Sequence, residues 1–253
     1  MTLRSPSLLQ QLLFGFGAIL LTAVGAVAQD AVILTNGTQQ AGKVIGCSPA
    51  GVQITVNQGS SITLPLASVK EVRMAPPAEF YAATRAMEAK NYDAALAALQ
   101  IVDKFRGLPA DWAQQAMEMR GEAFIDKGDM SKAEAAYADF QKLYPSLRGN
   151  PQLDVPLARL AAAKKNFADA KSKVEPVVAK AVEDKNPSRA NASLYSNALF
   201  VMGQVKESEG DFSGALDNYL KATTIFYQDK ATAAQAQEKA DALRKAHPGI
   251  FIP

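Results

Sequence analysis

Residues 114–147 read QQAMEMRGEAFIDKGDMSKAEAAYADFQKLYPSL, and this stretch decides the fold of the longer part of the chain. Apolar and small residues recur every three or four positions on both sides of the polar dipeptide at 128–129, which is typical of two amphipathic helices joined by a tight turn. Gly121 and Ala133 are small enough to let two antiparallel helices approach closely, and Pro145 ends the second helix. The stretch therefore predicts a helical hairpin.

Three further segments resemble the turn of this hairpin. Each has a tight turn, then an aromatic residue or a methionine, then a small residue at the start of a second helix. The four segments are Asn91–Leu96, Gly128–Ala133, Asn166–Ala170 and Gly210–Ala215. Internal similarity of this kind is typical of repeat proteins. From Pro77 onward the chain is rich in Ala, Leu, Lys, Glu and Gln, which favour helices, so we expect a stack of helical hairpins.

The hairpin at 114–147 resembles the tetratricopeptide repeat (TPR) family. The residues at the family's signature positions are Met117 in place of the usual tryptophan, Gly121, Phe124, Ala133, Tyr137 and Pro145. A second copy at 196–229 has Leu199, Gly203, Ala215, Tyr219 and Ala222 in register. The resemblance covers roughly residues 77–249. It implies a mainly α fold, a TPR-like α-solenoid of about four helix hairpins followed by a capping helix at 232–246.

Two features depart from a regular repeat. Pro176 falls inside the expected second helix of the third hairpin, where we expect it to kink or shorten that helix. Asn186 and Pro187 suit the cap and the first position of the next helix.

The segment from Asp30 to Arg73 has a different pattern, in which apolar and polar residues alternate. The clearest example is VQITV at 52–56, and other short strands are expected at 32–34, 43–47, 62–64 and 69–72. This arrangement resembles small SH3-like or Sm-like β-barrels in strand number and loop spacing. We therefore expect a small β-barrel-like domain at 29–75 and a TPR-like helical repeat domain at 76–253, with the boundary at the two prolines that follow Ala75.

Residues 1–28 have the pattern of a secretory signal peptide. Arg4 precedes an apolar run at 12–24, and Ala26-Val27-Ala28 supplies small residues at the cleavage positions. We expect cleavage after Ala28 and an exported protein, periplasmic or secreted; retention of the segment as an anchor is the alternative. Because Cys47 is the single cysteine, the chain has no intramolecular disulfide.

Composition excludes several classes of function. The formal net charge is +2 with both signs interspersed, which gives no sign of a nucleic-acid-binding surface. With one histidine, His247, and one cysteine, metal sites built from several such ligands are excluded. The string GTQQAGK at 37–43 is similar to a P-loop, but Val44 follows where the motif needs a hydroxyl group. We therefore predict no cofactor, no metal and no enzymatic activity.

The resemblance to TPR proteins implies a groove lined by exposed positions of the first helix of each hairpin. Those positions are Phe80, Thr84 and Met87, then Glu118, Glu122 and Asp126, then Arg159, and finally Asn197, Phe200 and Gln204. The three acidic residues recur every four positions and would form one negative stripe on a helix. The alternatives are that this stripe is a solvated helix face, and that Phe80, Met87 and Phe200 are buried against neighbouring elements rather than exposed as apolar anchors.

These observations predict a non-enzymatic exported scaffold that binds an envelope or secreted protein through the TPR groove. The alternative function is a cell-wall or glycan-binding module in which the β domain binds the ligand and the helices act as a spacer.

Overall fold

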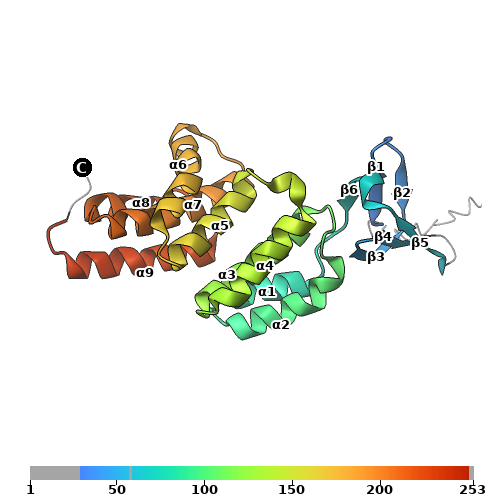
Figure 1. Cartoon of the computed structure of the whole chain (residues 1–253), viewed down its shortest axis with the longest axis horizontal. Coiled ribbons are helices and arrows are strands. Elements are labelled where there is room, and N and C mark those ends of the chain that lie inside the picture. The colour runs from blue at the N-terminus through green and yellow to red at the C-terminus, as the bar shows by residue number, and fades with distance from the viewer. Residues whose placement is uncertain (1–28, 57–58, 251–253) are drawn as a thin grey trace, which may run out of the picture.

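The computed structural model describes residues 29–56 and 59–250. This part of the chain contains nine α-helices, preceded by six short β-strands (Figure 1). The prediction that the chain is mainly α-helical is therefore confirmed. The predicted signal peptide lies outside the described residues.

The strands form two three-stranded antiparallel sheets, in the orders β2-β1-β6 and β3-β4-β5. Their bounds are β1 Ala31–Leu34, β2 Gln39–Ala41, β3 Lys43–Ser48, β4 Gly51–Thr55, β5 Ser61–Leu64 and β6 Val69–Arg73. Within β4 the alternation places Val52 and Ile54 in the interior, with 0% of each exposed. The five predicted strands are confirmed. β2 was not predicted because it is short and largely polar; it pairs with β1 across a turn at Gly37, whose φ is 84°.

One apolar core spans the sheets and the first helices. Val32 and Ile54 from the sheets belong to the same buried cluster as Phe80 of α1 (Ala78–Glu88) and Trp112 of α3 (Asp111–Asp126). Phe105, in a short 3-10 helix after α2 (Tyr92–Val102), packs edge-to-face on Trp112 with ring centroids 5.4 Å apart. Burial of these side chains therefore fixes the two sheets, which we call the β module (residues 31–73), onto the first helices.

Four helices begin in the same way, at the four segments whose similarity is evident in the sequence. They are α2, α4 (Met130–Leu143), α6 (Phe167–Glu183) and α8 (Phe212–Thr224). In each, an Asn or Asp N-cap accepts a hydrogen bond from the backbone N–H three residues later. The fourth residue of each helix is an alanine with no exposed surface, and these are Ala95, Ala133, Ala170 and Ala215.

The residue before each of these caps has a positive φ. Gly128 and Gly210 each adopt 79°, whereas Lys90 adopts 55° and Lys165 adopts 62°. Glycine takes this conformation without steric cost, but a side chain does not. The turn therefore keeps its shape even where the sequence lacks glycine.

Two of the hairpins share a close glycine–tyrosine contact. A Cβ atom at Gly121 of α3 would overlap the ring of Tyr137 in α4, and one at Gly203 of α7 (Arg189–Ser208) would overlap the ring of Tyr219 in α8. Both tyrosines are at most 1% exposed. The predicted role of Gly121 as a small residue at a close helix contact is confirmed.

The remaining helices are α5 (Pro151–Ala163) and α9 (Lys230–Ala246). The capping helix predicted at 232–246 is confirmed, and His247 is its C-terminal cap. Two other expectations need correction. The α7 cap is Ser188, whose hydroxyl accepts from the N–H of Asn191, so the predicted start at Asn186-Pro187 is two residues early. Of the two effects expected of Pro176, a kink or a shortened helix, shortening does not occur, because α6 continues over 17 residues.

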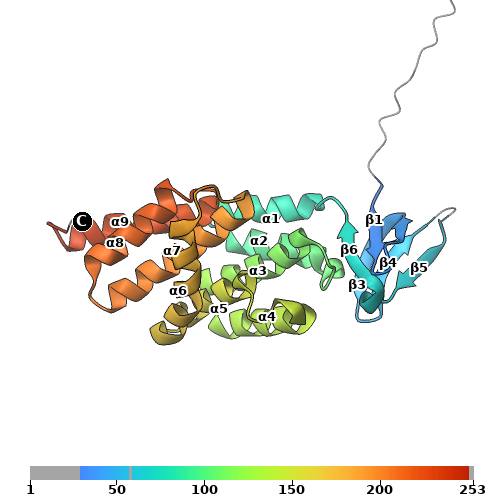
Figure 2. The same ribbon diagram turned by 90° about the horizontal axis from the view of Figure 1, so that it is seen from above.

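The last helix lies beside α8 and also contacts α1, so it brings the two ends of the helical array together (Figure 2). Lys90 at the end of α1 pairs with Glu238 of α9. Gln235 of α9 donates from Nε2 to Asp126 Oδ2 of α3 at 2.8 Å. Within the described residues, none of the helices is long and apolar enough to cross a membrane.

Candidate functional site

The predicted acidic stripe lies along α3 and faces a single arginine. Arg159 is the only charged residue in the apolar second half of α5, from Val155 to Ala163, and it is 5% exposed. The side chains of Glu122 and Asp126 are 12% and 13% exposed. The stripe is therefore not a solvated helix face.

Arg159 joins four helices through its guanidinium group. Its Nη1 donates to Glu122 Oε1 at 3.0 Å and to Asn197 Oδ1 of α7 at 3.3 Å. Its Nη2 donates to Asp126 Oδ1 at 3.2 Å and to Gln235 Oε1 of α9 at 2.6 Å. The planar, multiply donating shape of arginine suits this role better than lysine would. Arg159 thereby fixes α3, α5, α7 and α9 relative to one another.

A second set of hydrogen bonds holds Asn197 in place. Its Nδ2 donates to Asp229 Oδ2 at 2.9 Å, and its Oδ1 accepts from Thr232 Oγ1 at 2.9 Å. Asp229 also caps α9 by accepting from the N–H of Thr232. The Phe200 ring centroid lies 5.5 Å from Arg159 Cζ, within the range of a cation–π contact. We call Glu118, Glu122, Asp126, Arg159, Asn197, Asp229 and Gln235 together the polar centre.

Burial sets the protonation behaviour of the polar centre. Loss of solvent raises the pKa of Glu122 to about 7, against the opposing effect of Arg159 and with a further rise from Asp229 and Asp126. Burial also raises the pKa of Glu118 well above its ordinary value, and the negative charges of Glu122 and Asp229 add to the rise. The centre holds more carboxylates than its arginine can neutralise, so it has an affinity for protons or for other cations.

Tyr137 of α4 packs against Gly121 of α3, the helix that carries Glu118, Glu122 and Asp126. Burial raises the pKa of its hydroxyl well above the ordinary value, and the negative charges of Glu122 and Glu118 add to the rise. The side chain is 1% exposed, and its hydroxyl has no hydrogen-bond partner among the described residues. An unpaired buried hydroxyl costs free energy, so this group destabilises the folded chain beside the polar centre.

The structure brings six of the ten predicted groove residues together and places Phe80, Thr84, Met87 and Gln204 elsewhere. Glu118, Glu122, Asp126, Arg159, Asn197 and Phe200 meet around the polar centre. Of the two alternatives for Phe80, Met87 and Phe200, the structure supports burial: they are 8%, 6% and 5% exposed, because each packs in an apolar cluster. Thr84 bonds back to the Phe80 carbonyl at 3.1 Å, and the buried Oε1 of Gln204 has no partner among the described residues.

An open cleft of about 670 Å³ lies where β6 meets the first helices. Phe80 and Trp112 form part of its lining, and Tyr81, which is 49% exposed, lies on α1 at the same place. Residues 71–74 line it from the β module, Asp111 and Gln115 from α3, and Arg189 from the start of α7. Two predicted groove residues, Phe80 and Thr84, therefore border a cleft.

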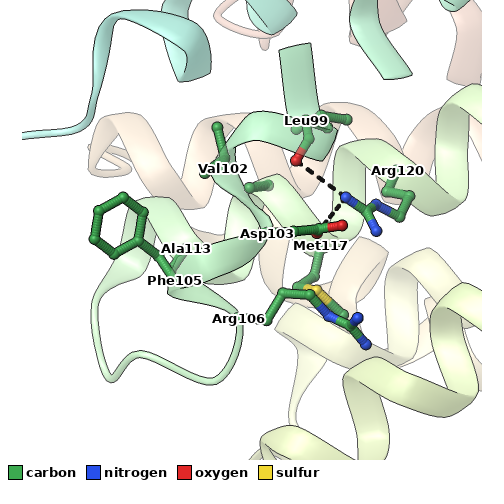
Figure 3. A pocket seen from close by; sticks show the side chains of 9 residues that line it. Leu99, Val102, Asp103, Phe105, Arg106, Ala113, Met117 and Arg120 are labelled. Carbon is green, nitrogen blue, oxygen red and sulfur yellow. Dashed lines mark hydrogen bonds and ion pairs between the residues drawn. The ribbon is translucent and has the colours of Figure 1, made fainter. Parts of the chain in front are cut away.

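A second, much smaller cavity lies between α2 and α3 (Figure 3). Its volume is about 10 Å³, which is the size of one water molecule. Arg120 lines it, donates to the Leu99 carbonyl at 3.1 Å and pairs with Asp103. The cavity is too small for a ligand, and we regard this group as structural.

Sequence reasoning did not find the residues that α9 contributes, Asp229, Thr232 and Gln235. They lie far along the chain from α3, and nothing in a polar capping helix marks them. The signal that was available is Arg159 itself, because a lone arginine in an apolar helix requires buried acceptors. Within the described residues, no cluster of His, Cys, Asp or Glu is placed to hold a metal ion.

Comparison with protein families, with curated proteins and with solved structures finds no match for this chain.

Proposed function

We propose that the chain is a non-enzymatic exported scaffold, a TPR-like α-solenoid that holds a segment of another envelope or secreted protein in the cleft between the β module and the first helices. The observation that carries this proposal is the open cleft of about 670 Å³ lined by α1, α3, β6 and the start of α7.

The repeated geometry of the hairpins supports the TPR-like architecture. The same cap, the same positive-φ turn and the same buried alanine recur at α2, α4, α6 and α8. The glycine–tyrosine contact recurs in two hairpins at the positions that the resemblance assigns to small and aromatic residues. Stacking of such units presents a continuous wall of first helices, which is the surface that repeat proteins use for binding.

The chemistry of the cleft suits a peptide segment. Its apolar lining includes Trp112 and Phe80, and the half-exposed Tyr81 ring offers an anchor of the kind that dominates binding at protein interfaces. Charged groups of both signs, such as Asp111 and Arg189, give specificity at the rim.

Affinity capture with the full chain from an extract of envelope and secreted proteins tests this function. We expect one specific partner to be retained, and we expect Tyr81→Ala combined with Gln115→Ala to release it. Tyr227→Ala is the matched control, because Tyr227 is 60% exposed and lies in the connection between α8 and α9. Capture that the cleft variant leaves unchanged would refute the cleft as the binding site.

The alternative, a cell-wall or glycan-binding module, is favoured by one observation: the β module itself supplies Glu71, Val72, Arg73 and Met74 to the cleft wall, next to the exposed Tyr81 ring. Purified cell-wall material separates the two functions, since it should be retained only under this second view. Point substitutions such as Arg73→Ala are the appropriate variants. Deletion of the β module would expose the core that it shares with Phe80 and Trp112.

Export remains part of the proposal. The pattern at 1–28 supports it, and sequencing the amino terminus of the protein from its native host tests it. We expect Gln29 as the first residue.

A further inference from the structure

The strand β5 forms a free edge of its sheet. The order β3-β4-β5 gives β5 one neighbouring strand, and Figure 2 shows β5 at the end of the molecule, away from the helices. Ser61, Ile62 and Thr63 are all exposed. No residue of β5 lines the cleft, so this edge is separate from the binding site proposed above.

Pairing with β4 shows which backbone groups of β5 face outward. The N–H of Val56 donates to the Ser60 carbonyl at 2.9 Å, just before β5 begins. Bonded and non-bonded positions alternate along an antiparallel ladder, so Ile62, two residues after Ser60, also bonds to β4. Ser61 and Thr63 therefore turn their N–H and C=O groups away from β4. Within the described residues, these groups have no backbone hydrogen-bond partner.

The open side of β5 lacks the features that prevent strands from pairing. Charged residues, proline, a bulge or a covering segment usually protect a sheet edge. β5 is uncharged over Ser61–Leu64, its register with β4 is regular, and no other strand of the described chain pairs with it. Ile62 is 37% exposed and belongs to no apolar cluster of the described residues. The edge can therefore accept a further strand.

A second copy of β5 matches this edge in one register. When two copies run antiparallel with the two-fold axis at Ile62, Ser61 of each copy lies opposite Thr63 of the other. All the outward N–H and C=O groups of both strands are then paired, because residues that face each other in this way exchange both bonds. A register centred on Thr63 would instead place Ser61 opposite Pro65, which has no N–H to donate.

Two further properties favour a second copy over a flexible peptide. The edge of another folded copy is already ordered, whereas a flexible peptide loses conformational entropy when it pairs, and a strand of four residues offers few bonds to offset that loss. At the axis, Ile62 also meets its own counterpart at the closely spaced, non-bonded position, so the exposed apolar surface of both side chains is covered.

We infer that β5 is a self-association surface, at which two copies of this chain join edge to edge with Ile62 on the two-fold axis. The sheets β3-β4-β5 of the two copies form one continuous sheet. This inference goes beyond the proposed scaffold function, and it gives that function a consequence: the dimer carries the cleft twice and holds two partner segments at once.

Disulfide formation tests the register. In a Cys47→Ala background, Ile62→Cys places one thiol of each copy at the axis, where the Cα atoms are about 4.5 Å apart and within disulfide range. Ser61→Cys is the matched control, because residues 61 of the two copies are diagonal neighbours, roughly 7–8 Å apart. We expect Ile62→Cys to form the covalent dimer about tenfold faster in oxidised glutathione, measured by non-reducing electrophoresis. Equal rates would overturn the inference.

Sedimentation equilibrium of the full chain tests association without added thiols. We expect the mass to rise from monomer towards dimer with concentration, and Thr63→Pro to weaken the dimer about tenfold or more by removing an N–H that each copy donates. Ala41→Pro is the matched control on β2, the edge strand of the other sheet. Its N–H also faces outward, since the next residue, Gly42, donates to Asp30. This control should dimerise like the wild type.

Ile62→Lys is a second variant that leaves the backbone unchanged. Two lysines would meet at the axis, so the dimer should be lost at low salt and partly recovered at high salt, where the charges are screened. A wild type that stays monomeric at every concentration, or a Thr63→Pro or Ile62→Lys variant that dimerises like the wild type, would overturn the inference. The proposed scaffold function is tested separately, because these substitutions leave the lining of the cleft unchanged.

Discussion

Replacing Arg159 by methionine should destabilise the protein more than any other single substitution in the polar centre. The guanidinium is hydrogen-bonded to four side chains and only 6% of its side chain is exposed. Methionine keeps the length and the apolar contact with Phe200 but removes the charge. Glu122 and Asp126 are then left buried without a counter-charge.

The expected loss is about 3–5 kcal/mol of unfolding free energy, the range for removing one partner of a buried ion pair. For a chain of this size, that loss corresponds to a fall in melting temperature of about 10 °C. Urea unfolding followed by far-UV circular dichroism at pH 7.5 measures the loss. Arg148→Met is the control, because Arg148 is exposed.

A compensating variant makes the reasoning sharper. Arg159→Met together with Glu122→Gln and Asp126→Asn removes the excess negative charge and should recover most of the lost stability, since neutral groups bury at lower cost. The loss in Arg159→Met alone should also shrink at pH 5, where the unpaired carboxylates take up protons. A loss below about 1 kcal/mol, or a triple variant no more stable than the single one, would refute the account of Arg159 as the counter-charge of α3.

Three further predictions concern the whole fold. The pKa of Glu122, about 7, and that of Glu118 are raised in the folded state, so folded protein holds protons that unfolded protein releases above about pH 4.5. The unfolding free energy measured in urea should therefore fall as the pH rises from 5 to 8. A rise over that interval in the wild type would contradict this. Gly121→Leu should cost roughly 1–3 kcal/mol, because a side chain there overlaps the Tyr137 ring, and an unchanged melting temperature would contradict that packing. Lys165→Gly should raise the unfolding free energy by about 0.5–1 kcal/mol by relieving a positive φ, and destabilisation in the same assay would contradict it.

Local patterns in the sequence were sufficient for most of the secondary structure. The alternation at 52–56 predicts β4, and the Asn or Asp caps before Ala95, Ala133, Ala170 and Ala215 predict where four helices begin. The start of α7 was missed because the segment at 186–188 offers two possible caps. The backbone N–H of Asn191, in the first turn of the helix, donates to the hydroxyl of Ser188 rather than to Asn186.

The candidate site was only partly predictable because its chemistry depends on contacts between distant helices. The spacing of Glu118, Glu122 and Asp126 is a local property of α3, and it correctly places them on one face. Whether that face meets water or another helix depends on Arg159 and on Gln235, which is more than 100 residues further along the chain. Burial of Phe80 likewise depends on contacts between distant residues, since the strands that cover it come from a different part of the sequence.

Because Gly203 and Tyr219 are in close contact, the residues that can be accepted at these two positions, which lie on different helices, depend on each other. Any larger residue at 203 collides with the phenol ring, and a smaller residue at 219 leaves a void against α7. In a selection for folded variants, a substitution at either site would survive mainly when a second change at the other site restores the fit. Suppressor genetics can therefore detect this pair of helices without any structural measurement.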